Sequence, residues 1–533
     1  MDGAHSPRGW SAGYRRPLMS INRKITHGIL SGSVLTVVSI AIALLQYRFI
    51  FQYLPKELTG VWFLFIAFSG YATFFDLGLG PTLSREMSFI IGDVKLDAAQ
   101  RAQRTADLLA TCRRIYYFLS ALVLVLALVA GTTYLLSVTP APNQREVQTA
   151  WTIFAFGAAL NILGAMSFAE LYGRGNVATE RLTRAAAQLI GFALAVGALV
   201  AGFGLIGLAC AWIVQCALAR FGAMYKLSRL REQHAIGGRY DPIVAKRIAM
   251  PSLKWAATAL GGVLILQTDN IVIASTLGPA MIAHYEPVAK IIATLMTFSM
   301  LVVTSSTPFL SQSYAAGDHA AVNAHVYRNV RVSMGAMIML ASFLCFYGNR
   351  IIDLWLGPGA FPGFPIIWVF SVMILLECHH ANLASAAMST GKQFFMAVAL
   401  LAGLLNIVIS WQLAKVFGLV GVAAGTMIAQ MLTNNWYVPY KSLQVLGIPF
   451  KEYARRTLLP LVGLLLLGLA VNAFFSTQFR EANTLLAIIA GFGLSLLACG
   501  TWFVAFVLTR SERSVLTARF ARAAATRNGS GTS

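Results

Sequence analysis

Residues Ala256–Gly278, AATALGGVLILQTDNIVIASTLG, lie at the midpoint of the chain, and the rest of the sequence is interpreted from them. The stretch is long and apolar enough to cross a bilayer, because a spanning helix needs about 20 apolar residues. It nevertheless contains Gln267, Asp269 and Asn270. A carboxylate inside hydrocarbon is costly unless it faces a partner, a cavity or water. The stretch therefore predicts a membrane helix in which Asp269 has one of these surroundings.

The composition is that of a polytopic membrane protein. The chain has 533 residues, of which 57% are hydrophobic and 11% charged, and its mean hydropathy is +0.69. A soluble protein of average composition has about 25% charged residues. The formal charge of +21 would suit a nucleic-acid binder, but Lys and Arg occur in short segments between apolar runs rather than on one folded basic face. We therefore expect no nucleic-acid partner.

Cysteines and glycines indicate packing roles. The cysteines form no CxxC pair and lie mostly in apolar runs, so we expect neither disulfides nor metal ligands from them: Cys112, Cys210, Cys216, Cys345, Cys378 and Cys499. The pairs Gly28-x-x-x-Gly32 and Gly421-x-x-x-Gly425 predict close helix contacts. The polar N-terminal segment is not expected to be a cleaved signal peptide.

Fourteen apolar segments are long enough to span a membrane. We predict them at residues 27–50, 60–80, 115–138, 149–172, 185–203, 205–224, 254–277, 285–309, 332–348, 365–389, 394–414, 418–438, 457–475 and 484–508. The segments on the N-terminal side of the membrane hold most of the Lys and Arg. Those on the other side hold few: Lys56, Arg145, Arg350, Lys415 and Arg480. By the positive-inside rule, both termini are predicted to be cytoplasmic.

Short phrases recur in the same order in the two halves of the chain. FGLIGLA at 203–209 opens the sixth span, and FGLVGVA at 417–423 opens the twelfth. PTLS at 81–84 near the end of the second span corresponds to PFLS at 308–311 near the end of the eighth. An even number of spans separates the copies, so the two units have the same orientation, and substrate sites are expected where such repeats meet.

The predicted fold is all-α, with two six-helix bundles in a parallel repeat around a central cleft and two extra C-terminal helices. The expected divisions are a cytoplasmic tail at 1–24, a first bundle at 25–230, a cytoplasmic linker at 231–252, a second bundle at 253–445, helices 13 and 14 at 446–509, and a basic cytoplasmic tail at 510–533.

Three phrases resemble a known family: FFDLGLGPTLSRE at 74–86, QTDNIVIASTLG at 267–278 and IIDLWLGP at 351–358. With the paired FGL-x-G openings, they are similar to Wzx-type flippases of the multidrug/oligosaccharidyl-lipid/polysaccharide (MOP) superfamily. The resemblance implies a V-shaped pair of bundles that moves an undecaprenyl-diphosphate-linked oligosaccharide, a unit of O-antigen, capsule or exopolysaccharide, across the bacterial inner membrane by alternating access. It also implies coupling to an ion gradient in some relatives.

Four cations are candidates for the anionic diphosphate: Lys290, Arg48, Arg220 and Lys254. Lys290, at the start of the eighth span, is the leading one, although Glu286 four residues earlier could simply pair with it. The resemblance implies functional arginines in the first span, where Arg48 lies; the alternative for Arg48 is snorkelling to the outer interface. Arg220 and Lys254 lie near the cytoplasmic surface, where a topological role competes.

Four further residues are candidates for ion coupling or gating: Asp269, Asp76, Glu377 and His380. Asp269 falls in the outer half of the membrane, where it either binds H⁺ or Na⁺ or holds the helix in register through a hydrogen bond. Asp76 lies near the cytoplasmic end of its span, where capping is the alternative. Glu377 and His380 share a helix face, which fits a proton relay or an interhelical hydrogen-bond network. A metal site would need a second Glu-x-x-His copy, and none occurs in the sequence.

The predicted function is therefore a flippase, not an enzyme, without a cofactor other than a coupling H⁺ or Na⁺. The expected partners are the lipid-linked glycan, membrane lipids, and a polysaccharide polymerase or export machinery. A cation-coupled multidrug exporter of the same superfamily and a membrane glycan polymerase remain as alternatives. An exporter typically has an acid in its first helix, whereas this first span has Arg48. A polymerase needs a large periplasmic loop, and the longest outside loop here is short.

Overall fold

Helices and their connecting turns make up the described chain. The computed structural model describes residues 36–76, 78–93, 95–230, 237–392, 394–510 and 512–514, and no strand occurs among them. The predicted N-terminal tail, the Gly28/Gly32 pair and most of the C-terminal tail lie outside these residues. The prediction of an all-α membrane protein is confirmed.

The spans agree with the predicted count of about fourteen. Twelve helical stretches in the described residues are long and apolar enough to cross a membrane, beginning with the helix Thr36–Tyr53. One of them, Met396–Leu446, has 51 residues, and at Gly418 its backbone turns to φ 58 and ψ −137, so it contains two spans. The helix α2 (Lys56–Phe74), with 19 residues, has the length of another.

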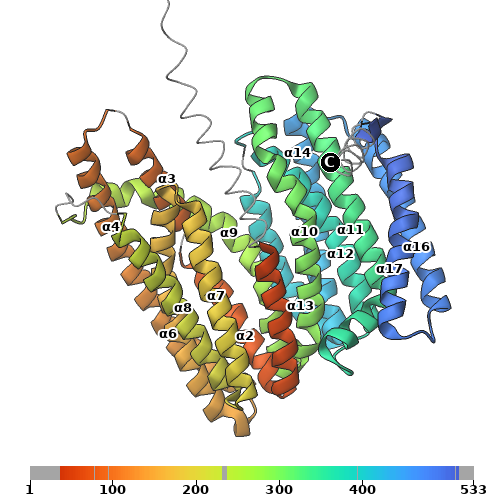
Figure 1. Cartoon of the computed structure of the whole chain (residues 1–533), viewed down its shortest axis with the longest axis horizontal. Helices are drawn as coiled ribbons and strands as arrows, with labels where there is room; N and C mark the ends of the chain where they lie inside the picture. The colour runs from red at the N-terminus through yellow and green to blue at the C-terminus, as the bar shows by residue number, and fades with distance from the viewer. Residues whose placement is uncertain are drawn as a thin grey trace, which may run out of the picture. The chain divides into compact units, whose positions relative to one another are not determined.

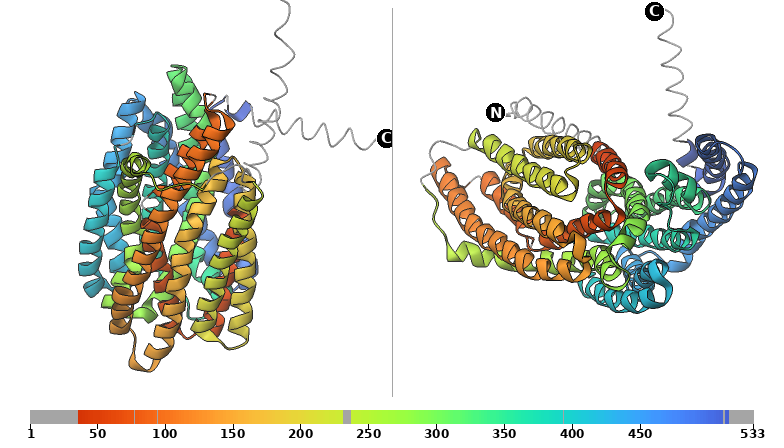
Figure 2. Two further views of the ribbon diagram at one scale, coloured as in Figure 1. Left: turned by 90° about the vertical axis from the view of Figure 1, so that its left-hand side faces the viewer. Right: turned by 90° about the horizontal axis from the view of Figure 1, so that it is seen from below.

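The chain divides into two compact units, with residues 1–54 and 71–256 in unit 1 and residues 55–70 and 257–533 in unit 2. Besides Thr36–Tyr53, unit 1 contains α3 (Leu79–Gly92), α4 (Ala98–Leu126, continued by α5, Thr132–Val138), α6 (Gln144–Gly173), α7 (Val177–Val200) and α8 (Gly204–Ser228). In this unit α6 contacts α3, α4 and α8, and α7 packs on α8. Figures 1 and 2 show α4, α6, α7 and α8 side by side, in colours from orange to yellow.

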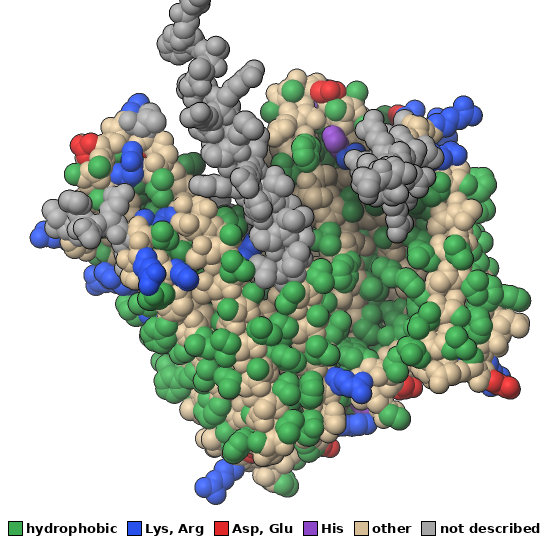
Figure 3. Space-filling model, in the orientation of Figure 1, with side chains coloured by type: hydrophobic (Ala, Val, Ile, Leu, Met, Phe, Trp, Pro, Cys, Tyr) green, Lys and Arg blue, Asp and Glu red, His purple; other side chains and the backbone are tan. Residues whose placement is uncertain are grey.

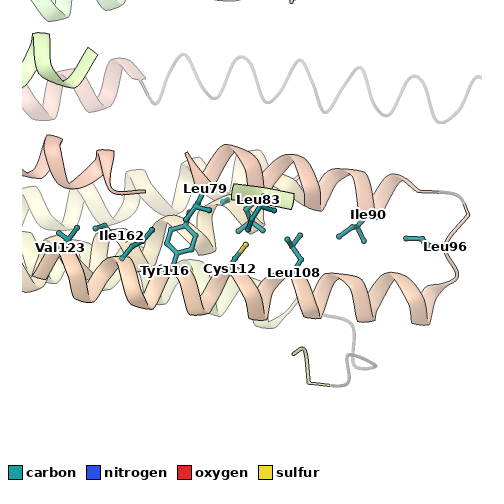
Figure 4. Packing of buried hydrophobic residues seen from close by; sticks show 12 residues of the cluster. Leu79, Leu83, Ile90, Leu96, Leu108, Cys112, Tyr116, Val123 and Ile162 are labelled. Carbon is teal, nitrogen blue, oxygen red and sulfur yellow. The ribbon is translucent and has the colours of Figure 1, made fainter. Parts of the chain in front are cut away.

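The core of unit 1 lies between α3, α4 and α6 (Figure 4). Leu79, Leu83 and Ile90 of α3 face Leu108 and other apolar side chains of α4. These residues recur at helical spacing, which gives each helix one apolar stripe. α4 begins with a capping box, in which the Gln100 backbone N donates to the Asp97 side chain at 2.7 Å and the Asp97 backbone N donates to Gln100 Oε1 at 3.4 Å. The start of α4, and with it the turn between α3 and α4, is thereby fixed.

Unit 2 is arranged around α11 (His319–Leu356). This helix contacts α10 (Ile282–Ala315), α12 (Phe364–Met388), α16 (Leu459–Gln478) and α17 (Thr484–Trp502). Unit 2 also contains most of α2, the second part of α9 (Pro242–Thr276), α13 (Met396–Leu432), α14 (Asn434–Leu446) and the short α15 (Phe450–Tyr453). Polar side chains join the buried faces: Asn472 of α16 donates to Ser495 of α17 at 3.1 Å and to Ser342 of α11 at 3.4 Å. Hydrogen bonds of this kind stabilise helix association in a membrane, where the hydrophobic effect does not drive helices together.

Close helix contacts at glycine are confirmed for the second predicted pair. The chain reverses at Gly418, with a positive φ that glycine adopts without strain. The two halves of α13 then pack so closely that a Cβ on Gly425 would lie 2.5 Å from the Ser410 Cα, and one on Gly421 would meet the Leu413 carbonyl. Ser410 is thereby brought against the second half of α13.

Large apolar side chains cover the lengths of the helices. Figure 3 shows hydrophobic side chains over most of the visible face, with Lys and Arg gathered toward helix ends. On α16 and α17, for example, Leu466 and Leu497 are exposed. A soluble monomer rarely exposes contiguous apolar surface on this scale. These surfaces are those of a multi-pass membrane protein.

Candidate functional sites: a buried carboxylate network and an arginine-lined cavity

Asp269 lies at the centre of a buried polar network in unit 2. Its side chain comes from α9 and is 9% exposed. Its Oδ2 accepts a 2.5 Å hydrogen bond from the Tyr285 hydroxyl of α10. The Thr426 hydroxyl lies 2.9 Å from Oδ1 and 3.1 Å from Oδ2, and the Asn406 amide lies 3.4 Å from Oδ1. Three helices thus converge on one carboxylate.

The network contains more oxygen atoms that can accept hydrogen bonds than hydroxyl protons that can be donated to them. The Thr426 hydroxyl has one proton, yet it lies within hydrogen-bond distance of both Asp269 oxygens and of Asn406 Oδ1, at 2.8 Å. The Ser410 hydroxyl approaches the same Asn406 oxygen at 2.8 Å and the Val422 carbonyl at 3.2 Å. Hard cations bind through carboxylate, carbonyl and hydroxyl oxygens of this kind. The residues present therefore suit either a proton on Asp269 or a small hard cation such as Na⁺.

A second pair of contacts lies beside this network. Asn270, next to Asp269 on α9, donates a 2.5 Å hydrogen bond to Glu286, next to Tyr285 on α10. Glu286 also interacts electrostatically with Lys290, four residues further along α10. Lys290 is half-buried, and Glu286 offsets its charge in part. The pairing expected as the alternative for Lys290 is present.

Unit 1 contains a cavity of about 500 Å³ lined by arginine. The cavity lies between α4, α6, α8 and the segment Gly237–Gly238. Arg101 and Arg113 of α4, Arg174 at the end of α6 and Arg220 of α8 line it, together with Glu170. Glu170 pairs with Arg174 at 3.0 Å. The remaining guanidinium groups leave the cavity with an excess of positive charge, which suits an anionic ligand.

The segment Gly237–Asp241 closes one side of this cavity against α4. The Arg239 backbone N donates to Asp107 at 2.9 Å, and the Asp241 backbone N donates to Thr111 at 3.0 Å. A Cβ on Gly238 would overlap the Ala106 backbone, so only glycine allows the segment to pass this closely.

Comparison with known proteins agrees with the fold. Residues 99–359 match the model of a family described as polysaccharide biosynthesis protein. The lipid II flippase MurJ, in an inward closed conformation, is similar with a TM-score of 0.69 and 14% identity, covering 88% of this chain and 97% of that one. An inward-facing multidrug resistance MATE family transporter of the MOP superfamily is similar with a TM-score of 0.59 and 13% identity, covering 78% and 98% of the two chains. The chain shares the fold of these two transporters, and its residues 99–359 are similar to the polysaccharide biosynthesis family.

Another MOP-superfamily transporter, from Pyrococcus furiosus, is similar with a TM-score of 0.52 and 13% identity, covering 79% of this chain and 95% of that one. A reversed polarity of the binding pocket is described for that protein. No curated protein sequence matches this chain. Identities this low establish the fold, and the activity is a separate question.

The other predicted site residues are dispersed. Arg48 is exposed on the helix Thr36–Tyr53, and the side chain of Lys254 lies outside the described part of the structure. Asp76 accepts a 2.5 Å hydrogen bond from the Tyr116 hydroxyl and a 3.0 Å hydrogen bond from the Gly80 backbone N. The second bond caps the start of α3, and capping was the alternative to gating for this residue. The transport roles of Arg48, Lys254 and Asp76 stay predictions.

Glu377 and His380 share one face of α12, with Glu377 Oε2 and His380 Nδ1 3.4 Å apart. The neighbouring His379 is hydrogen-bonded to the Tyr453 hydroxyl at 2.7 Å, and Tyr453 stacks on Tyr327. The described residues contain no group of three or more His, Cys, Asp or Glu arranged to hold a metal ion. The interhelical hydrogen bond is made by His379, whereas Glu377 Oε1 and His380 Nδ1 are buried without a hydrogen-bond partner among the described residues. The roles expected for Glu377 and His380 stay predictions.

Sequence reasoning missed most members of both sites. It identified Asp269 but not its partners Tyr285, Asn406, Ser410 and Thr426. Of the cavity arginines it identified Arg220 alone. The sequence does contain a signal for the network. Asn406 and Ser410 are polar residues four positions apart in a largely apolar span, and Thr426 directly follows the Gly421/Gly425 pair. No such signal marked the cavity, since loop-proximal arginines occur throughout this chain.

Proposed function

We propose that this chain is a flippase that moves an undecaprenyl-diphosphate-linked oligosaccharide from the cytoplasmic to the periplasmic leaflet of the bacterial inner membrane by alternating access. The observation that carries the proposal is the match of residues 99–359 to a polysaccharide biosynthesis family within a chain that has the fold of a lipid II flippase. The glycan is a unit of O-antigen, capsule or exopolysaccharide. Both termini are cytoplasmic in this proposal.

The electrostatics support an anionic substrate. Translocation makes and breaks no covalent bond, so the protein must only replace the hydration of the diphosphate and the sugars with polar and cationic groups. Lys290, Arg48, Lys254 and Arg220 are the proposed cations, and arginine in particular binds phosphate through two parallel hydrogen bonds. The cavity around Arg220 is the described place where several such groups converge.

Ion coupling is assigned to the Asp269 network in this proposal. Binding of H⁺ or Na⁺ among Asp269, Asn406 and Thr426 would change the net charge where α9, α10 and α13 meet. A ligand shifts a conformational equilibrium only by its difference in affinity for the two states. The carboxylate would therefore drive the cycle if opening of unit 2 separates it from its oxygen neighbours. Asp76, Glu377 and His380 are assigned the weaker role of gating.

The second candidate is a cation-coupled multidrug exporter, which the similarity to a MATE transporter favours. The charge of the unit 1 cavity disfavours it, because guanidinium groups repel cationic drugs.

Deletion of the gene separates the two candidates. The flippase predicts loss of one surface glycan, with its lipid-linked unit accumulating on the cytoplasmic face, and restoration by a plasmid copy. Lys290→Ala should complement less well than Lys290→Arg, which keeps the charge. Unchanged glycan export in the deletion strain, with raised susceptibility to cationic drugs, would assign the chain to the exporters instead.

A further inference from the structure

We propose that the arginine-lined cavity of unit 1 is a headgroup site that captures the diphosphate of the lipid-linked glycan in the cytoplasmic leaflet, before it enters the transport path. The inference rests on the proposed function, and it deepens it by assigning a loading step to residues that all belong to unit 1.

The charges of the cavity are unbalanced. Of its four arginines, Arg174 is engaged by Glu170, with contacts of 3.0 Å and 3.1 Å. Arg101 donates to the carbonyls of Asp93 and Leu96, and its Nε is buried without an acceptor. Arg113 and Arg220 have no acceptor among the residues that the structure describes. Guanidinium groups held together without counter-charges repel one another, and a bound anion removes that cost.

The shape of the cavity suits a headgroup. Its volume of about 500 Å³ falls in the range of about 300 to 1,000 Å³ that is typical of small-molecule sites. α6 has a glycine, Gly164, opposite the base of Arg220, where an added Cβ would lie 3.7 Å from the arginine Cβ. The arginine stem therefore lies close along α6. Tyr117, which is 52% exposed, lines the same cavity and offers a ring face for a sugar.

The position of the cavity suits loading from the cytoplasmic leaflet. Arg174 caps the end of α6, and Arg220 lies in the last third of α8. In the orientation predicted from the basic segments, both helix ends are cytoplasmic. A topological role accounts for arginines near these ends one at a time. It does not require four of them to line one cavity, nor two of them to stand without acceptors in the described structure.

The test measures binding of undecaprenyl diphosphate to the purified full-length protein in detergent, by native mass spectrometry titration. Arg113→Gln and Arg220→Gln remove one guanidinium each, and each should weaken binding by at least about tenfold, the loss expected from a charge-assisted hydrogen bond. Arg114→Gln is the matched control, because Arg114 is adjacent to Arg113 but lies over the Tyr240 ring at 4.8 Å and does not line the cavity. Its affinity should equal that of the wild type.

Three outcomes would overturn the proposal. They are unchanged affinity in both cavity variants, an equal loss in Arg114→Gln, and equal competition by phosphatidylglycerol, which would assign the cavity to ordinary phospholipid. Thermal unfolding of each variant confirms that it is folded. The binding readout is independent of glycan export. If the cavity variants bind normally, the loading site fails while the proposed function stands; if the deletion strain exports glycan normally, the function fails whatever the binding result.

Discussion

At the scale of single residues, Asp269 shows how a carboxylate is kept inside a membrane protein. Desolvating an isolated carboxylate costs several kcal/mol, and the cost is offset only by good hydrogen bonds. Tyr285, Thr426 and Asn406 supply such bonds from two other helices. The same bonds fit a structural role and an ion-binding role, so a measurement must distinguish them.

Removing the charge while keeping the shape makes that distinction. Asp269→Asn retains one oxygen acceptor but binds Na⁺ poorly. If the network binds Na⁺, replacing choline chloride with NaCl at equal ionic strength should raise the Tm of the wild type. At one hundred times Kd the gain is about 2.7 kcal/mol. Asp269→Asn should show no such shift in Tm. The control Asp353→Asn removes a carboxylate of α11 that lies outside the network, and it should keep the shift. A Na⁺-independent Tm in the wild type would leave H⁺ as the only coupling ion of the proposal.

At the scale of elements, the hairpin within α13 joins packing to the Asp269 site. Gly425→Ala should push the second half of α13 away from Ser410, because the new Cβ would lie 2.5 Å from the Ser410 Cα. Overpacking of this kind costs about 1 to 3 kcal/mol. We expect a lower Tm and, since Ser410 contacts Asn406, a smaller Na⁺-dependent shift. Gly500→Ala in α17 is the control, because nothing lies within 4 Å of its added Cβ. Equal effects of the two substitutions would contradict the close packing.

The end of the last span is held to α11 by an ion pair. Arg331 is 4% exposed and donates a 2.6 Å hydrogen bond to Glu512. Burial opposes ionisation of the Glu512 carboxyl, but hydrogen bonds from Thr509 and Arg331 outweigh it and hold its pKa below its usual range. Glu512→Gln leaves the buried guanidinium without a counter-charge and should lower the free energy of unfolding by about 1 to 3 kcal/mol at neutral pH.

The pH dependence of this effect has a definite sign. Because the folded pKa of Glu512 is depressed, the pair stabilises fully above the unfolded pKa of about 4.3, and the contribution disappears as pH falls through the folded value. The Tm values of the wild type and Glu512→Gln should therefore converge in acid. The exposed Glu481 provides the control, since Glu481→Gln should follow the wild type at every pH. A constant difference down to strongly acidic pH would argue against the ion pair.

At the scale of the whole molecule, the sequence was sufficient for the helices and insufficient for the sites. Apolar runs of spanning length predicted the helical segments because the bilayer sets their length, and the glycine pair at Gly421 predicted a close contact because only small residues permit it. The Asp269 partners come from helices far apart in the chain, and hydropathy does not encode which faces meet. The cavity depends on where Gly237–Asp241 crosses α4, which follows from two side-chain caps, Asp107 and Thr111.

Measuring the membrane orientation of the whole chain also tests the proposed loading step. With the N-terminus cytoplasmic, a fluorescent protein fused after Ser533 should fluoresce, and alkaline phosphatase fused in the turn between α11 and α12, near Gly359, should be active in the periplasm. The physical reason is the excess of Lys and Arg on the N-terminal side, which the positive-inside rule retains in the cytoplasm. A reporter fused at Gly238 provides the matched point within the cavity wall and should behave as cytoplasmic. Phosphatase activity at that position would place the arginines on the periplasmic side, where they could not capture a headgroup from the leaflet in which it is made.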